Sequence, residues 1–329
     1  MMNDIDLSET APRGDWYSGN GWKPIAGAGE DEFTGVFDGN GYAIKNMHIY
    51  GELDSSENKI GLFGKCQSAT IEHLALADCD IDVTTGNSSG NYVGSIVGYL
   101  NNQSSILECY TTGTIKIVFL SGSYGSYTGG IIGYANYGNI ENCFNACNIS
   151  STLKDENGRF YFGGIAGNFV NGQSFLNYSV GDIITTDESS AESKIGYIAN
   201  NALNDYDLKS CFYLKKNTDY TASANHSDNY YTNVIGLTAG QMKSSAAFTG
   251  FDFDNIWTID PNADYPYPTL RNVPYVSTGA SQPQTPSPDT SLKGDINGDG
   301  KVDATDASII LIYAAMVGAG YQVSIDDLY

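Results

Sequence analysis

The chain has 329 residues, and its 16 Lys plus Arg against 38 Asp plus Glu give a formal net charge of −22. A surface this acidic repels phosphate backbones and disfavours nucleic-acid binding. No apolar run is long enough to span a bilayer, so we expect no membrane insertion. The 38 glycines and 24 tyrosines, with only 16% charged residues, are typical of a turn-rich β protein.

The first residues, MMNDIDLSETAPRGDW, have neither the basic region nor the apolar region of a signal peptide. Because NDIDLS has the pattern of an interior strand, we expect the sequence to be a fragment of a longer protein. The six cysteines include no CxxC pair, which argues against a zinc or redox site and against a disulfide framework.

Two columns of residues repeat along the chain with a period of about 34 residues. The glycine column follows the segments KIGLFGK, YVGSIVGY, TGGIIGYA, FGGIAGNF and KIGYIANN, and comprises Gly61, Gly94, Gly129, Gly163 and Gly196. The second column comprises Leu74, Cys109, Cys143, Asn177 and Cys211. Two independent columns that keep one period indicate a repeat architecture.

Within each repeat, short apolar runs alternate with Gly, Asn and Ser clusters, which predicts strands and turns. A unit of this size cannot bury its own apolar face, whereas stacked coils can. We therefore predict an all-β, parallel β-helix-like solenoid of about six coils. The cysteines of the second column would point inward as buried free thiols. The glycine column would mark close backbone approach or positive φ.

The segment FTGVFDGNGYAIKNMHI, with the GLFG, VGSIVG and ENCFNACNI units that follow it, resembles the GLUG-motif repeats of bacterial surface and secreted proteins. The stretch from Leu237 to Leu270 is similar to the segment that ends such arrays. The resemblance implies a right-handed solenoid over residues 1–272, located outside the cell or at its surface. Some proteins with these repeats are zinc metallopeptidases, but the three histidines here, His48, His73 and His226, form no HExxH motif, so this activity does not carry over.

Residues 273–292 are rich in Pro, Ser and Thr and predict a flexible linker. Residues 293–329 begin with GDINGDGKVDATD, which has Gly300 at the sixth position of an EF-hand-like loop. Oxygen ligands without His or Cys select a hard cation, and a flexible loop with this many ligands favours Ca²⁺. The predicted calcium ligands are Asp295, Asn297, Asp299, the Lys301 carbonyl, Asp303 and Asp306.

This loop follows a linker and precedes a single apolar helix, DASIILIYAAMVG. The arrangement resembles a type I dockerin, a calcium-dependent module that binds cohesin domains of cellulosome scaffolds, with its second loop-helix repeat missing. The resemblance implies a cohesin partner. It places the contacting residues at Ala304, Thr305, Leu311, Ile312 and Met316. Burial of the three helix residues against the missing repeat is the alternative.

These patterns favour an extracellular, non-catalytic repeat protein that docks on a cohesin-bearing scaffold through calcium and uses the solenoid as a display or adhesion surface. Polysaccharide or host glycan is a further expected partner. A separate possibility is an adhesin whose exposed tyrosines, Tyr124, Tyr127, Tyr134 and Tyr137, stack on sugars or protein ligands, and cross-strand packing is the alternative role for these side chains. The alternative is a polysaccharide-degrading glycosidase or lyase, which needs a pair of close carboxylates. The repeats offer many carboxylates and no reason to prefer a pair: Asp31, Glu32, Asp38, Asp78, Asp80, Asp82, Asp155 and Glu156.

Overall fold

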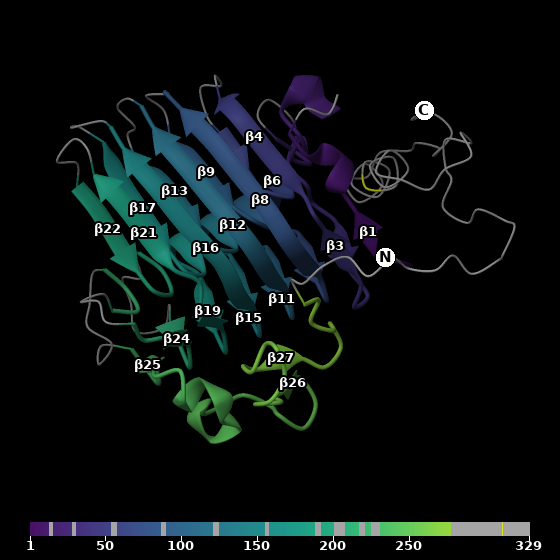
Figure 1. Ribbon diagram of the computed structural model, residues 1–329, viewed down its shortest axis with the longest axis vertical. Helices are drawn as coiled ribbons and strands as arrows, with labels where there is room; N and C mark the ends of the chain where they lie inside the picture. The colour runs from purple at the N-terminus through teal and green to yellow at the C-terminus, as the bar shows by residue number, and fades with distance from the viewer. Residues whose placement is uncertain are drawn as a thin grey trace, which may run out of the picture.

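The computed structural model describes residues 1–12, 16–27, 31–53, 58–86, 90–120, 125–154, 158–187, 192–200, 208–216, 221–224, 231–277 and 311. The described chain is an all-β, parallel β-solenoid (Figure 1). The predicted fold class is confirmed at this level, while the right-handed sense of the winding stays a prediction. No helix among the described residues has the length and apolar character needed to cross a bilayer.

Four sheets form the walls of the solenoid. Sheet A contains β1 (Ile5–Asp6), β3 (Ala43–Lys45), β4 (His48–Leu53), β8 (Ala75–Thr85), β12 (Tyr110–Phe119), β16 (Phe144–Leu153), β20 (Tyr178–Ser179), β21 (Ile183–Asp187), β24 (Phe212–Leu214) and β25 (Ile235–Leu237). Sheet B contains β6 (Phe63–Gln67), β10 (Val97–Asn101), β14 (Ile132–Asn136) and β18 (Ala166–Val170). Sheet C contains β2 (Val36–Asp38), β7 (Thr70–Glu72), β11 (Ser105–Leu107), β15 (Asn139–Glu141), β19 (Gln173–Phe175) and β23 (Leu208–Lys209). Sheet D contains β5 (Asn58–Ile60), β9 (Asn91–Gly94), β13 (Ser126–Gly129), β17 (Arg159–Gly163) and β22 (Glu192–Gly196).

The remaining elements are small. A separate antiparallel pair joins β26 (Trp257–Thr258) and β27 (Thr269–Leu270). The short 3₁₀ helices are η1 (Ser8–Thr10), η2 (Trp16–Gly19), η4 (Gln241–Lys243) and η5 (Ser245–Ala247).

Each full turn of the chain passes through sheets D, B, C and A in that order. Four turns are complete, from β5 to β21, and the described chain adds a partial turn at each end. The expected six coils are therefore not all complete, because at the ends sheet B continues only as isolated bridges such as Ile25 with Phe63 and Ala166 with Ala199. Paired residues lie one repeat apart, as in the pairing of Ile106 with Ile140, which confirms the period of about 34 residues.

The interior is a set of apolar columns, one side chain per turn. In sheet C, Phe37, Ile71, Ile106 and Ile140 follow one another in register and are 6% exposed or less. All six cysteines are free and buried, as predicted for inward-facing thiols. Such columns make a one-residue slip of a strand costly, because it would turn the inward-facing side chains to the outer face.

The glycine column lies where sheets D and B meet. A Cβ atom on Gly94 would lie 2.5 Å from the carbonyl oxygen of Val97, and one on Gly129 would lie 2.1 Å from that of Ile132. None of the five glycines of the column is among the described residues with positive φ. Glycine recurs in this column because the backbones approach closely there. A positive φ, the other expected reason, does not apply to these five glycines.

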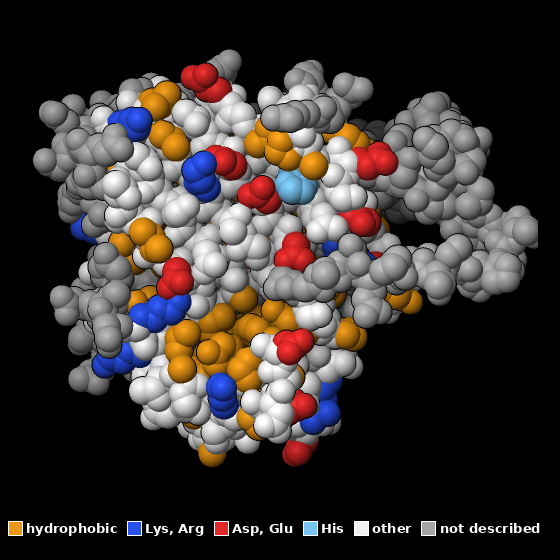
Figure 2. All heavy atoms as spheres, in the orientation of Figure 1, with side chains coloured by type: hydrophobic (Ala, Val, Ile, Leu, Met, Phe, Trp, Pro, Cys, Tyr) orange, Lys and Arg blue, Asp and Glu red, His pale blue; other side chains and the backbone are white. Residues whose placement is uncertain are grey.

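Residues 237–276 form a C-terminal cover that runs back across the outside of sheet A. On that face Tyr110, Phe144 and Tyr178 stack with ring centroids 4.7 and 5.0 Å apart. The cover closes over this aromatic column with Trp257, which is fully buried, and with Tyr275, which stacks on Tyr110. Figure 2 shows hydrophobic side chains gathered on the surface beside the cover, where it meets the strands. The cover shields one side of the solenoid from solvent. Because it packs on side chains of several successive turns, it also stabilises their stacking.

The glycine contacts make a direct prediction about stability. Gly133→Ala would place a Cβ atom 2.5 Å from the Val93 nitrogen and 2.6 Å from the Gly98 oxygen, and neither backbone atom can move aside. We expect the free energy of unfolding to fall by about 3 kcal/mol in urea denaturation.

Gly240→Ala is the matched control, because no atom lies within 4 Å of the added Cβ atom and φ is −70°. Its effect should stay within about 0.5 kcal/mol. Equal losses in the two variants would contradict the close-approach explanation.

Candidate functional site

The turn from sheet C to sheet A has one left-handed residue per repeat. These residues have φ between 47° and 57° and comprise His73, Glu108, Asn142, Leu176 and Ser210. The next residue along the chain belongs to the second column and is buried. Two side chains of this column accept a backbone N–H of the neighbouring turn: the Cys143 N–H donates to Asn177 Oδ1 at 2.8 Å, and the Cys109 N–H donates to Cys143 Sγ at 3.3 Å. These two side chains satisfy backbone groups at the bend.

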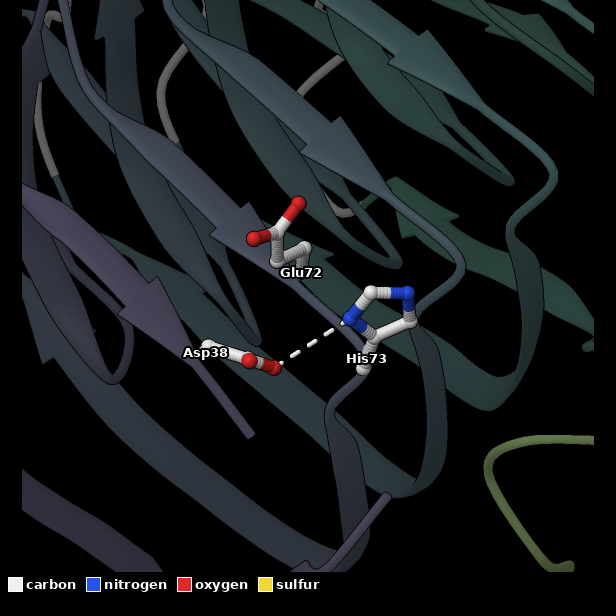
Figure 3. Close-up of side chains that lie close together, drawn as sticks. All are labelled: Asp38, Glu72 and His73. Carbon is white, nitrogen blue, oxygen red and sulfur yellow. Dashed lines mark hydrogen bonds and ion pairs between the residues drawn. The ribbon is translucent and has the colours of Figure 1, made fainter. Parts of the chain in front are cut away.

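Chemically active side chains come together at the first of these turns. Asp38 ends β2 and is in register with Glu72, which ends β7 and directly precedes His73. The ligand atoms of the three side chains all lie within 4.8 Å of one another. Figure 3 shows Asp38 directed at His73, whose Nδ1 lies 3.2 Å from Asp38 Oδ1. We call this group the Asp38 corner.

The acidic side chains continue along the same edge in the following turns. Glu108 Oε1 lies 4.0 Å from His73 Nε2, while Glu108 Oε2 is buried and has no hydrogen-bond partner in the described part of the chain. Farther along, Glu141 Oε1 accepts a hydrogen bond from Asn142 Nδ2 at 3.4 Å. Burial, and to a smaller extent the charge of Glu108, raises the pKa of the Glu141 carboxyl.

The Asp38 corner combines carboxylate and imidazole donors, a set that suits divalent transition metals better than calcium. The side chains of Asp38 and His73 are 47% and 33% exposed, so solvent competes with any bound cation. One oxygen of Asp38 and one of Glu72 lie within 4.8 Å of each other, and a retaining glycosidase places its two carboxyl groups about 5–5.5 Å apart. The geometry thus permits cation binding or acid–base chemistry at this corner.

Three of the carboxylates singled out in the sequence pair locally. Asp82 contacts Lys116 at 2.8 Å, Asp80 accepts from Thr114 Oγ1 at 2.8 Å, and Glu32 pairs with Lys65. Asp78 differs from these three in its surroundings, because burial raises the pKa of its carboxyl. Asp155 and Glu156 lie outside the described residues. Among the six candidates that the structure describes, only Asp38 belongs to a group of side chains that could hold a metal ion. Its partners Glu72 and His73 were not paired with it from the sequence.

The predicted calcium ligands, Asp295 to Asp306, lie outside the described residues, as do Ala304, Thr305, Ile312 and Met316. Leu311 is described: it is helical, 1% exposed and belongs to the same hydrophobic cluster as the solenoid interior. Contact between Leu311 and a partner would first require that this side chain leave that environment.

Comparisons with known proteins show a similar fold and assign no activity. No family model matches the chain. A stretch of 118 residues, 35% of the chain, is 36% identical to halomucin of Haloquadratum walsbyi, and the match spans only 1% of the length of halomucin. A solved structure from Bacteroides ovatus, provisionally described as an immunoglobulin A1 protease, covers 83% of this chain and 85% of its own, with a TM-score of 0.50 and 18% identity. At this identity the likeness concerns the fold alone.

The environment of Glu141 predicts a pH-dependent effect on stability. Because its pKa is raised in the folded chain, the ionised carboxylate destabilises the fold at neutral pH, and this penalty disappears as the pH falls below the unfolded-state pKa. Glu141→Gln should therefore raise the melting temperature at pH 7 by about 1 °C, since solvent screens much of the effect.

At about pH 3.5 the two melting temperatures should coincide, because both side chains are then uncharged. Differential scanning calorimetry at the two pH values makes the comparison. A destabilising substitution at pH 7 would contradict the assigned direction.

Proposed function

We propose that this chain is an extracellular, non-catalytic repeat protein whose solenoid presents a binding surface. Its C-terminal tail would attach it through calcium to a cohesin domain on a scaffold. The observation that supports a non-catalytic body concerns the charged side chains outside the Asp38 corner: the ion pairs among described residues there are single pairs across neighbouring turns, as in Lys116 with Asp82 and Lys45 with Asp4. Such pairs on exposed strands stabilise a surface only weakly and do not converge on a substrate.

The location outside the cell is part of the proposal. It is supported by the resemblance to GLUG-motif repeats and by the partial similarity to halomucin, a protein named as a mucin. Peptidase activity is not proposed, although the structural neighbour is described as a protease, because the sequence lacks an HExxH motif.

The proposed attachment to a scaffold depends on the C-terminal tail. Four carboxylates, Asp295, Asp299, Asp303 and Asp306, are crowded into one loop, so their repulsion opposes loop closure until a divalent cation binds. Binding would then order the following apolar helix for its partner, as the resemblance to a dockerin implies. Calcium acts in this proposal as a folding ligand.

Calorimetric titration tests the calcium site. The full chain should bind Ca²⁺ with a dissociation constant of about 10⁻⁷–10⁻⁵ M, and Asp295→Asn/Asp299→Asn should weaken this at least about a hundredfold. A cohesin domain immobilised on a sensor should capture the chain with calcium and release it with EDTA.

Glu72→Gln is the matched control, since it removes one carboxylate from the Asp38 corner and leaves the tail intact. Its calcium affinity should equal that of the parent chain. Loss of calcium binding in Glu72→Gln, with unchanged binding in Asp295→Asn/Asp299→Asn, would move the cation to the Asp38 corner and refute the tail site.

A glycosidase remains the second candidate, and one observation favours it: the oxygens of Asp38 and Glu72 lie within 4.8 Å of each other. The primary proposal predicts that incubation with soluble polysaccharides yields neither new reducing ends nor unsaturated products. Products that form with the parent chain and disappear in Asp38→Asn and in Glu72→Gln would establish the enzyme instead.

A further inference from the structure

Tyrosines form two columns on the outside of the solenoid, one in each of the sheets that meet at the glycine column. In sheet D, Tyr92, Tyr127 and Tyr161 follow one another in register across β9, β13 and β17. In sheet B, Tyr99 and Tyr134 are in register across β10 and β14. We call these five side chains the tyrosine face. It lies apart from the C-terminal cover and from the Asp38 corner.

The rings of the tyrosine face hold one another in fixed positions. Tyr92, Tyr127 and Tyr161 stack with successive centroid distances of 5.7 and 4.9 Å. Across the two columns, Tyr127 meets Tyr134 edge to face at 4.9 Å. Outward-facing rings of sheets D and B therefore contact each other, so the outer faces of the two sheets turn toward one another here. The stacked ring faces are covered by their neighbours, which leaves the ring edges and hydroxyl groups for a ligand.

The tyrosine side chains of this face are partly exposed. Burial raises the pKa of Tyr127 to about 12 and also raises that of Tyr134, so both hydroxyls stay protonated at neutral pH. No hydrogen bond joins the hydroxyl groups of Tyr99, Tyr127, Tyr134 or Tyr161 to another described residue. Beneath the C-terminal cover, by contrast, the hydroxyl of Tyr110 donates to the Pro274 carbonyl at 2.9 Å and accepts from the Val276 N–H at 2.7 Å.

The electrostatics of the face favour an uncharged ligand. Both columns are free of carboxylates, and their ends carry cations: Lys59 and Lys194 continue the sheet D column, and Lys65 begins the sheet B column. Lys65 is neutralised by Glu32 and lies 6.0 Å from the centre of the Tyr99 ring. A polyanion would meet a chain whose net charge is −22, whereas a neutral polyhydroxyl compound is not repelled.

The repeat of the face favours a polymer. Two successive turns present a phenol group in both sheets, and the next turn continues the sheet D column, in steps of about 4.8 Å. A ligand built from like units and laid along the solenoid axis would meet similar contacts at each of these turns. An extended peptide fits less well, because it advances about 3.3 Å per residue and binds sheets mainly at an unpaired edge.

We propose that the tyrosine face binds a neutral polysaccharide, which lies along the solenoid axis and exchanges hydrogen bonds with the tyrosine hydroxyls. This inference rests on the proposed function, and it assigns the binding surface and its class of ligand. Among the tyrosines singled out in the sequence, Tyr127 and Tyr134 belong to the face. Tyr137 lies outside it at the turn from sheet B to sheet C, and Tyr124 lies outside the described residues.

The test is calorimetric titration of the full chain with hexasaccharides of cellulose, xylan, mannan and laminarin, and with a hexagalacturonate. We expect at least one neutral hexasaccharide to bind. Tyr127→Phe/Tyr134→Phe retains the stacked rings and removes two hydroxyl groups, so it should bind about tenfold more weakly at an unchanged melting temperature. Tyr137→Phe, which removes a hydroxyl from a side chain that is 54% exposed, should bind as the parent chain does.

The inference is overturned if none of the neutral hexasaccharides binds, if only the hexagalacturonate binds, or if the double variant binds as tightly as the parent. Failure here is distinguishable from failure of the proposed function. If the double variant binds normally while the tail still binds calcium and no products form, the adhesion surface lies elsewhere on the solenoid. If bound hexasaccharide is cleaved, the chain is an enzyme and the proposed function fails, whatever the tyrosines do.

Discussion

The structure depends on one constraint: every turn stacks on the last in parallel register, with equivalent residues one repeat apart. Backbone hydrogen bonds between turns require this alignment. The buried columns stabilise it further, because a one-residue slip would turn inward-facing side chains to the outer face. The same constraint shapes the outside of the molecule. A residue type that recurs once per repeat becomes a surface column, as the tyrosines of sheets D and B do.

The constraint also explains where reactive groups gather and where they do not. On flat strands, opposite charges meet across neighbouring turns and neutralise each other, as Lys116 and Asp82 do. At the first bend between sheets C and A, the left-handed residue His73 lies beside the strand end of the preceding turn of the solenoid and the equivalent side chain of the next turn. This is how His73 comes to lie between Asp38 and Glu108, residues 35 positions away on either side.

Much of the fold could be predicted from the repeat alone. The spacing of Gly94 and Gly129, and of Cys109 and Cys143, gave the period, the parallel stacking and the inward direction of the thiols. The Asp38 corner was missed because its members differ in chemical type and so form no column that composition reveals. Comparing residues one repeat apart would have placed Asp38 beside Glu72, since these are 34 positions apart. The path of the C-terminal cover follows from no repeat, because long-range packing of Trp257 and Tyr275 on the aromatic column decides it.

The central claim is that a passive stacked body carries its binding surface on the tyrosine face and its cation in the tail. A crystal structure of the full chain grown with calcium chloride and a bound neutral hexasaccharide tests both parts at once. The account predicts sugar density along Tyr127 and Tyr134 and a calcium ion among Asp295, Asp299 and Asp303. Calcium held by Asp38 and Glu72, with sugar seated at that corner, would contradict it.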